Sequence, residues 1–224
     1  MSWDVVLFTV VMAALAVAIT LPVALYLACL LARKRLPGKT LVEALVTVPL
    51  VLPPVATGFA LLLLFGPNGW IGSILERFGV EVIFTWKAVV VAMAVMSFPL
   101  MVRTARVGFE SVDMNLEDAA RSFGAKPWKV FWQITLPLAR RAVLGGVVLG
   151  FARALGEFGA TIMVAGNIPG RTTTISLAIY SEVFSGDNPA ALKLIGVSLL
   201  LALGALALGE RLWRPVPGSS AERV

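Results

Sequence analysis

One polar segment organises this sequence, and its residues 118–137 read DAARSFGAKPWKVFWQITLP. The segment contains the pattern Asp-Ala-Ala, three residues, Gly, nine residues, Ile-x-Leu-Pro, in which the aspartate is Asp118, the glycine Gly124 and the isoleucine Ile134. Strongly apolar stretches flank it on both sides. A basic, helix-forming loop between membrane-buried stretches faces water, and it is therefore where a soluble partner can bind the chain.

The composition of the flanking stretches indicates a membrane protein. Of the 224 residues, 58% are hydrophobic and 14% are charged, and the mean hydropathy is +0.90. A soluble domain of this length has too little interior to bury so much apolar surface. Because the composition does not shift along the chain, we predict one all-α integral membrane domain over residues 1–224. No histidine and the single Cys29 argue against a disulfide, a metal site or a histidine-based catalytic triad.

Five apolar stretches approach the roughly 20 residues that a helix needs to cross a bilayer. They predict transmembrane helices at residues 5–32, 44–65, 86–106, 142–166 and 189–209, with a polar loop over 110–138. Pro49, Pro53 and Pro54 are expected to interrupt the second helix, and Pro99 the third. Such prolines either kink a helix or mark unwound backbone at a gate, and the sequence leaves both readings open.

Positive charge predicts how these helices are oriented. Of the 19 Lys and Arg residues, four follow the first stretch, seven lie from Arg103 to Arg141, and three follow the last stretch, including Arg214 and Arg223. Only four lie on the other side, and the remaining one, Arg153, lies inside a predicted span. Because cytoplasmic loops carry the excess of Lys and Arg, we predict an external N-terminus and a cytoplasmic C-terminus. The pI near 10.0 then reflects this asymmetry and anionic lipid headgroups rather than nucleic-acid binding.

The polar loop predicts two short helices. Asn115 is placed to cap the first helix, and Gly124 is placed to end it. Pro127 is placed to begin the second, which carries aromatic and basic residues typical of a membrane interface. The apolar face of the first helix consists of Leu116, Ala119, Ala120 and Phe123. Such a pair either caps the helix bundle or, through its small residues, lets another protein approach closely.

The loop resembles the signature of ABC-importer permeases, which is Glu-Ala-Ala, three residues, Gly, nine residues, Ile-x-Leu-Pro. Asp118 stands at the Glu position, which keeps the charge but shortens its reach. The segments at 33–39, 49–54 and 151–171 are similar to the oxyanion branch, and the short chain with residues 166–174 looks most like molybdate permeases. The resemblance implies a type I, MetI-like fold in the cytoplasmic (inner) membrane of a bacterium or archaeon.

The resemblance also implies partners and a docking helix. A second copy of the chain would form a homodimer, joined by two cytoplasmic ABC ATPase subunits and an external oxyanion-binding protein. ATP would be bound by the ATPase, so we expect no cofactor, no metal and no ATPase site in this chain. The coupling helix that docks on the ATPase would comprise Leu116, Glu117, Asp118, Ala119, Ala120, Arg121, Ser122, Phe123 and Gly124.

Two charges lie inside the fourth apolar stretch. Arg153 and Glu157 are four residues apart, so on a helix they share a face and can pair. Charges at this depth face a bundle interior or a wet cavity. They are either a structural pair or, with Pro53 and Pro54, part of the translocation path or its gate. The turn at 166–174, which holds Asn167 and Arg171, is either a contact for the binding protein or an ordinary loop.

These expectations give a main hypothesis and three alternatives. The main hypothesis is the permease of an ATP-driven importer of molybdate or tungstate, and the nearest alternative carries sulfate or thiosulfate. An ATPase-independent channel or secondary transporter would not need a docking helix, and no inverted repeat is visible. A membrane enzyme or assembly factor is disfavoured because the chain has no His, Cys motif or acidic cluster.

Overall fold

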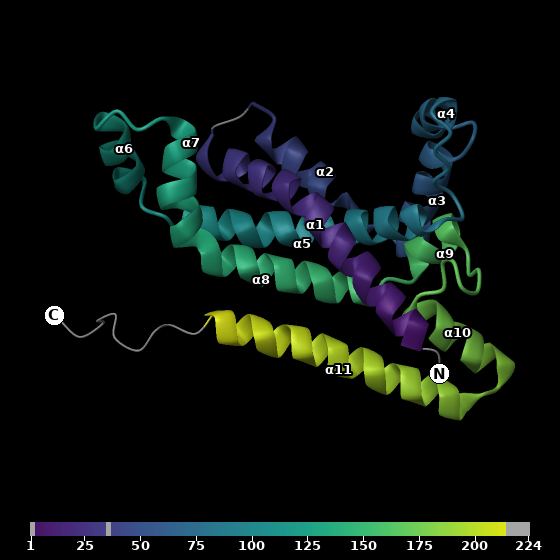
Figure 1. The fold of residues 1–224 in the computed structure, drawn as a ribbon. Coiled ribbons are helices and arrows are strands. Elements are labelled where there is room, and N and C mark those ends of the chain that lie inside the picture. Colours follow the sequence, from purple (N-terminus) through teal and green to yellow (C-terminus); the bar gives the residue numbers. More distant parts are fainter. Residues whose placement is uncertain (1–2, 35–36, 214–224) are drawn as a thin grey trace.

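The computed structural model describes residues 3–34 and 37–213, and the described part of the chain contains helices and connections but no strand (Figure 1). Three of the basic residues that predicted the orientation, Arg35, Arg214 and Arg223, lie outside the described residues. The elements are α1 (Trp3–Arg33), α2 (Lys39–Val51), α3 (Pro54–Phe65), α4 (Trp70–Arg77), α5 (Trp86–Glu110), α6 (Met114–Ser122), α7 (Pro127–Val130), η1 (Phe131–Thr135), α8 (Leu136–Leu155), α9 (Gly159–Ala165), α10 (Ile175–Ser185) and α11 (Asn188–Trp213).

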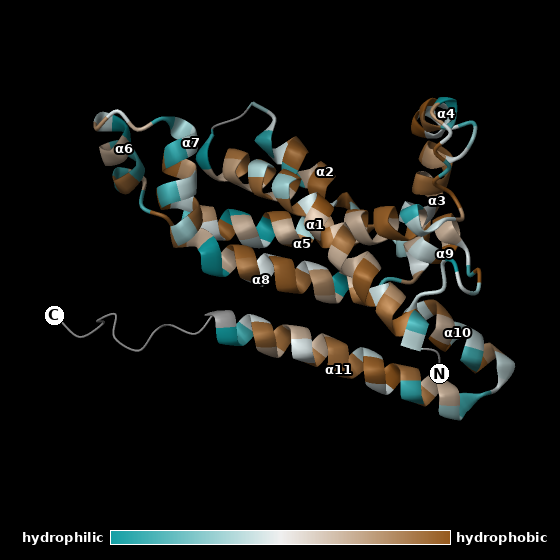
Figure 2. Ribbon diagram, in the orientation of Figure 1, coloured by the Kyte–Doolittle hydropathy of each residue, from teal (hydrophilic) through white to brown (hydrophobic). Residues whose placement is uncertain are grey.

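Four helical stretches are long and apolar enough to cross a bilayer. They are Trp3–Arg33, Trp86–Glu110, Pro127–Leu155 and Asn188–Arg211, and α2 with α3 makes a fifth if this bent pair is one span. Hydrophobic residues run along α1, α5 and α11, whereas α6 and α7 are largely hydrophilic and lie at one end (Figure 2). The helices α4, α9 and α10 lie at the opposite end (Figure 1).

The second expected span, residues 44–65, consists of two helices, and the chain bends by 111° at the break between them. Leu52 precedes a proline and adopts an extended conformation (φ −68°, ψ 144°), as the ring of the next residue requires. Pro54 then occupies the first turn of α3, where its missing N–H costs nothing. Of the three expected interruptions, Pro53 and Pro54 therefore make the break, whereas Pro49 stays inside α2.

At Pro99 the backbone does not unwind, so that reading of the expected interruption is wrong. The helix α5 runs without a break from Trp86 to Glu110, with Pro99 inside it. An internal proline removes one backbone hydrogen bond but leaves the rest of the ladder. Pro99 is buried in the helix bundle, where packing against neighbouring helices stabilises α5 across the proline.

The fourth expected span, residues 142–166, also differs from the structure. The helix α8 begins earlier, at Leu136, and ends at Leu155, and α9 follows after a break at Gly156–Phe158. Glu157 lies in this break, where its carboxylate accepts a hydrogen bond from the backbone N–H of Ala160 at 2.7 Å. A side chain thus satisfies a donor at the start of α9 that the interrupted helix leaves unpaired.

Two helices, α4 and α10, have no counterpart among the expected elements. With eight and eleven residues, α4 and α10 are too short to be predicted as membrane-spanning helices, which need roughly 20 residues. Local signals still define α10. The Thr174 hydroxyl accepts from the N–H of Leu177 at its start, and Gly186 ends it with φ +83°, a left-handed conformation that suits glycine.

Small side chains bring α1, α5 and α8 into close contact. The main core contains Ala13 and Ala16 from α1, Ala92 and Met93 from α5, and Ala154 from α8, all of them buried. Small residues let backbones approach closely, which is how helices associate in a bilayer without a hydrophobic driving force between them. By contrast, α11 packs on α8 and α10 with one side only. Of the 18-residue apolar stretch that qualifies α11 as a span, just 11% is buried.

The two breaks face each other through a contact between α3 and α9. A Cβ atom added to Gly58 would lie 2.7 Å from the Cα of Ala160 and 2.8 Å from the Cβ of Met163. Likewise, a Cβ added to Gly159 would lie 2.7 Å from the Cβ of Pro54. Real Cβ atoms do not approach this closely, so α3 and α9 can pack as they do only because both positions are glycine.

We therefore expect Gly58→Ala to destabilise the chain by about 1–3 kcal/mol, the usual cost of overpacking. The matched control is Gly196→Ala in α11, where an added Cβ meets nothing within 4 Å. Thermal unfolding of both purified variants in the same detergent measures the difference. Equal melting temperatures would contradict the close α3–α9 contact.

Candidate functional site

The helix α6 begins and ends through local signals. Its cap is Asp113, whose carboxylate accepts a hydrogen bond from the backbone N–H of Asn115 at 2.9 Å. The expected cap, Asn115, lies instead inside the first turn. Gly124 follows the helix with φ +83°, a conformation that L side chains rarely adopt, so the predicted stop at this glycine is confirmed.

The side chains of α6 are arranged opposite to those of an ordinary surface helix. Its single buried side chain belongs to the charged Glu117, which is 2% exposed. The apolar side chains point to solvent, since Leu116 is 50% exposed and Phe123 is 93% exposed. Asp118, Ala119 and Ser122 are also exposed. Of the predicted apolar face, Leu116, Ala119 and Phe123 are therefore exposed, whereas Ala120 is partly buried.

The buried Glu117 carboxylate joins α6 to two other elements. Its Oε1 lies 2.6 Å from Nη2 of Arg33 at the end of α1, and it accepts a hydrogen bond from the Thr135 hydroxyl at 2.8 Å. Its Oε2 lies 3.0 Å from Nη2 of Arg121 one turn along α6, and Arg121 also pairs with the exposed Asp118 at 2.7 Å. Charge-assisted hydrogen bonds of this length are the strong ones, so they anchor α6.

Sequence reasoning missed both distant partners of Glu117. Arg33 belonged to a basic segment that predicted the orientation and resembled the oxyanion branch, and Thr135 occupied the unspecified position of the Ile-x-Leu-Pro run. The contacts join residues 84 and 18 positions apart, which no helical or strand period connects.

The chain continues from α7 into α8 without a turn. Pro127 occupies the first turn of α7 as predicted, and Phe131–Thr135 form a π-helical segment that leads into α8. Phe131 packs against Phe109 of α5 with ring centroids 5.9 Å apart. Because Thr135 lies in this segment, the hydrogen bond to Glu117 connects α6 directly to the start of α8.

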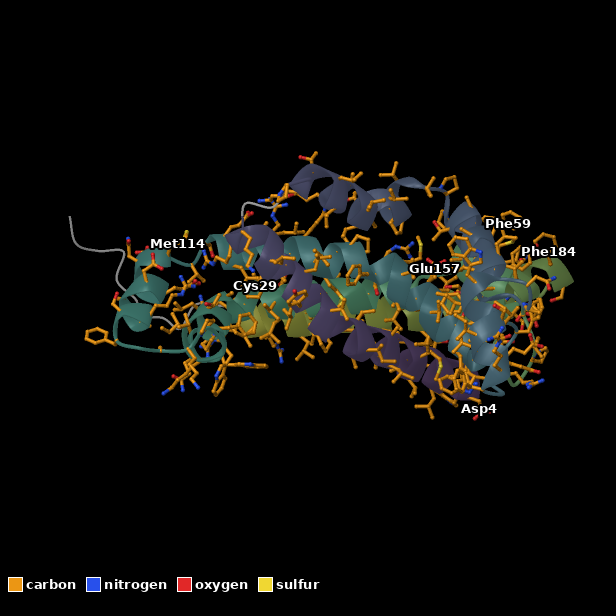
Figure 3. The ribbon with its side chains drawn as sticks, turned by 90° about the horizontal axis from the view of Figure 1, so that it is seen from above. Asp4, Cys29, Phe59, Met114, Glu157 and Phe184 are labelled. Carbon is orange, nitrogen blue, oxygen red and sulfur yellow. The ribbon has the colours of Figure 1, made fainter. Side chains whose placement is uncertain are left out.

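The intramembrane charges form a pair at the α8–α9 break. Nη1 of Arg153 lies 2.8 Å from Oε2 of Glu157, whose side chain is 1% exposed, while Arg153 retains 26% exposure. Figure 3 places Glu157 in the interior, far along the bundle from Met114 at the start of α6. Pro54 packs on Gly159 beside this pair. The structure thus brings Pro54 to the α8–α9 break, whereas Pro53 lies at the preceding bend.

The two residues of the expected outer turn have different surroundings. The side chain of Asn167 donates to the Ser181 hydroxyl at 2.7 Å and accepts from the Thr173 hydroxyl at 2.8 Å, so it ties the turn to α10. Arg171 is exposed and borders a cavity of about 530 Å³ with Trp86. Asn167 is therefore held by hydrogen bonds within the turn and to α10, whereas Arg171 is free to meet solvent or a partner.

Long apolar helices that pack through small residues and end in a polar helical loop define a multi-spanning membrane protein. Residues 20–212 match the family described as "Binding-protein-dependent transport system inner membrane component". The chain belongs to this family and is an integral inner-membrane permease, as the loop motif predicted.

Curated relatives and a solved structure support this assignment. The chain is 46% identical over 215 residues to the molybdenum transport system permease protein ModB of Escherichia coli (strain K12), covering 95% of this chain and 94% of that protein. It is 40% identical over 198 residues to the sulfate transport system permease protein CysT of the same strain, covering 87% and 72%. The MetNI methionine ABC transporter in an inward-facing form matches with a TM-score of 0.66 at 18% identity, covering 95% and 92%, which confirms the predicted fold.

We expect Glu117→Gln to release α6 from the bundle, because removing one member of a buried ion pair costs about 3–5 kcal/mol. Tryptic cleavage after Arg121 of the folded protein should accelerate by about tenfold or more, since local opening exposes that bond. The matched control is Asp118→Asn, which removes a carboxylate that is 61% exposed and whose pair contributes only about 0–1 kcal/mol. Equal cleavage rates in the two variants would show that Glu117 does not anchor the helix.

Proposed function

We propose that this chain is the permease subunit of an ATP-driven importer that takes up molybdate, with tungstate as a related cargo. In this proposal it works as a homodimer with two cytoplasmic ATPase subunits and an external oxyanion-binding protein. The observation that carries the proposal is the outward apolar face of α6 on a chain of this family. The chain itself needs no cofactor, because ATP is bound by the partner.

The exposed face of α6 suits a protein partner. Leu116 and Phe123 are large apolar side chains on a hydrophilic end of the molecule, where water solvates them poorly. Ala119 lies between them and is also exposed, so a partner can approach the helix backbone closely. Burying such a patch in the cleft of another protein is favourable by the hydrophobic effect. We assign this face to the ATPase.

The anchor at Glu117 supports a mechanical role for α6. A force on α6 reaches α1 through Arg33 and the start of α8 through Thr135, because both side chains contact the same buried carboxylate. Closure of the ATPase dimer on ATP then moves the ends of two spanning helices together. Alternating access follows when this movement opens the bundle to the outside and hydrolysis reverses it.

The proposed gate consists of the two helix breaks, one between α2 and α3 and the other between α8 and α9. Arg153 keeps part of its surface exposed while Glu157 neutralises most of its charge, so a divalent anion would be attracted weakly and released easily. Pro53 and Pro54 supply the facing break. Arg171, with its turn held in shape by Asn167, is the proposed contact for the binding protein.

Charge supports the proposed orientation. By the order of the helices, Arg33, Lys39, Arg106 and Arg140 all lie at helix ends on the α6 side of the bundle. The positive-inside rule then makes this side cytoplasmic, with α1 beginning outside. An ATPase that uses cytoplasmic ATP would meet α6 on this side.

The cargo assignment rests on the named relatives. The chain shares 46% identity with a molybdenum permease across nearly the whole of both proteins, but 40% with a sulfate permease. Sulfate is therefore the second candidate. Both are tetrahedral divalent anions, so the same gate chemistry would serve either one.

We expect Ala119→Arg to abolish co-purification of the permease with its ATPase, because a long charged side chain would hold the docking surfaces apart. Asn68→Arg adds the same charge to an exposed loop at the opposite end of the molecule and should leave co-purification unchanged. Normal co-purification of the Ala119→Arg variant would overturn the docking role of α6.

We also expect molybdate or tungstate with the cognate binding protein to stimulate ATPase activity of the reconstituted complex, and sulfate to stimulate it much less. Steady-state phosphate release in liposomes measures this, with the unloaded binding protein as control. Stimulation by sulfate alone would identify sulfate as the cargo and would leave the proposed ATP-driven mechanism unchanged. No response to any of the three anions in an intact complex would contradict oxyanion import.

A further inference from the structure

An apolar groove runs along the outside of α1 toward α6. One stripe of α1, which includes Leu21, Leu25 and Cys29, forms one wall, and Phe131 and Trp132 of η1 form the other. The groove has a volume of about 720 Å³, within the roughly 300–1,000 Å³ of ligand-binding pockets. Figure 3 shows Cys29 on the part of α1 near α6 and far from Glu157. The groove is therefore separate from the proposed gate.

The length of the groove matches one leaflet of a bilayer. Its wall on α1 extends from Leu21 to Lys34, which at 1.5 Å per residue is about 20 Å. Half of the hydrocarbon core plus one headgroup layer is also about 20 Å. Leu21 lies near the middle of α1, so the groove begins near the bilayer centre and ends at its surface.

Charge is confined to the surface end of the groove. Arg33, Lys34 and Arg121 line that end together with the carboxylate of Glu117, which Arg33 and Arg121 share. Arg121 also pairs with Asp118, so Lys34 supplies the remaining positive charge. Lys34 is exposed and forms no ion pair with any side chain in the described part of the chain. The groove thus offers apolar walls below and an excess of positive charge at its mouth.

Aromatic side chains mark the same boundary. Trp128 and Trp132, which are 64% and 60% exposed, both line the groove. Amphipathic rings of this kind concentrate at the level of lipid headgroups, which agrees with the position of the basic residues.

We infer that this groove binds an anionic glycerophospholipid of the leaflet on the α6 side. An acyl chain lies along Leu21, Leu25 and Cys29, and the phosphate lies at Lys34 beside Arg33 and Arg121. Basic pockets between membrane helices select anionic headgroups by charge. Because Arg33 also holds Glu117, the lipid sits next to the anchor of α6. The inference concerns binding of lipid alone and does not depend on the cargo.

The sole cysteine provides the test. The full-length permease in detergent is alkylated with N-ethylmaleimide while dioleoyl phosphatidylglycerol or dioleoyl phosphatidylcholine is titrated in. We expect phosphatidylglycerol to slow alkylation of Cys29 by several-fold in a saturable manner, and phosphatidylcholine with the same chains to slow it much less. Native mass spectrometry of the same samples should count one tightly bound phosphatidylglycerol per chain.

Two matched variants test the headgroup contact. Lys34→Gln should raise the phosphatidylglycerol concentration for half-protection by about fivefold, the effect of one basic residue near a membrane surface. Arg140→Gln removes the same charge from an exposed position at the start of α8, away from the groove, and should leave half-protection unchanged.

Three results would overturn the inference. Equal protection by the two lipids would remove the charge selectivity, and no protection by either would leave the groove unoccupied by lipid. Efficient oxidative cross-linking of Cys29 between two copies would instead show that a second chain covers this face.

Discussion

The buried carboxylate of Glu117 is the interaction on which the polar end of this structure depends. A charge at 2% exposure is tolerated only when it is fully paired, and Arg33, Arg121 and Thr135 meet this requirement from three elements. The polar contact holds α6 in place, so the apolar side chains of this helix are not needed for folding. They remain available to a partner because the anchor is electrostatic.

A second constraint governs the opposite end, where two helices break inside an apolar bundle. Backbone groups there have no water to bond, so each break must be satisfied within the protein. At α2–α3, prolines remove donors at the bend itself, and at α8–α9 the Glu157 side chain takes up the N–H of Ala160. Arg153 neutralises that carboxylate. The intramembrane ion pair therefore has a structural task, whatever its proposed part in transport.

The sequence predicted helix ends that depend on neighbouring residues. It did not predict features that depend on contacts between residues far apart in the chain. Gly124 and Pro127 act locally, and their places at the end of α6 and the start of α7 were correctly expected. Asp113 displaced Asn115 as the cap because both residue types can cap a helix and the two positions are only two residues apart. The 111° bend and the partners Arg33 and Thr135 depend on how separate helices pack, which a single sequence does not display. The docking and gating roles of the named residues remain predictions.

The outward face of α6 has a consequence for biogenesis. A chain inserted without its partner presents Phe123, at 93% exposure, and Leu116 to water for as long as it stays alone. Orphan subunits of this kind associate with themselves or with chaperones and are degraded. On the proposed docking, the amount of permease that persists in the membrane is set by the supply of its ATPase, so one short helix also serves to match subunit stoichiometry.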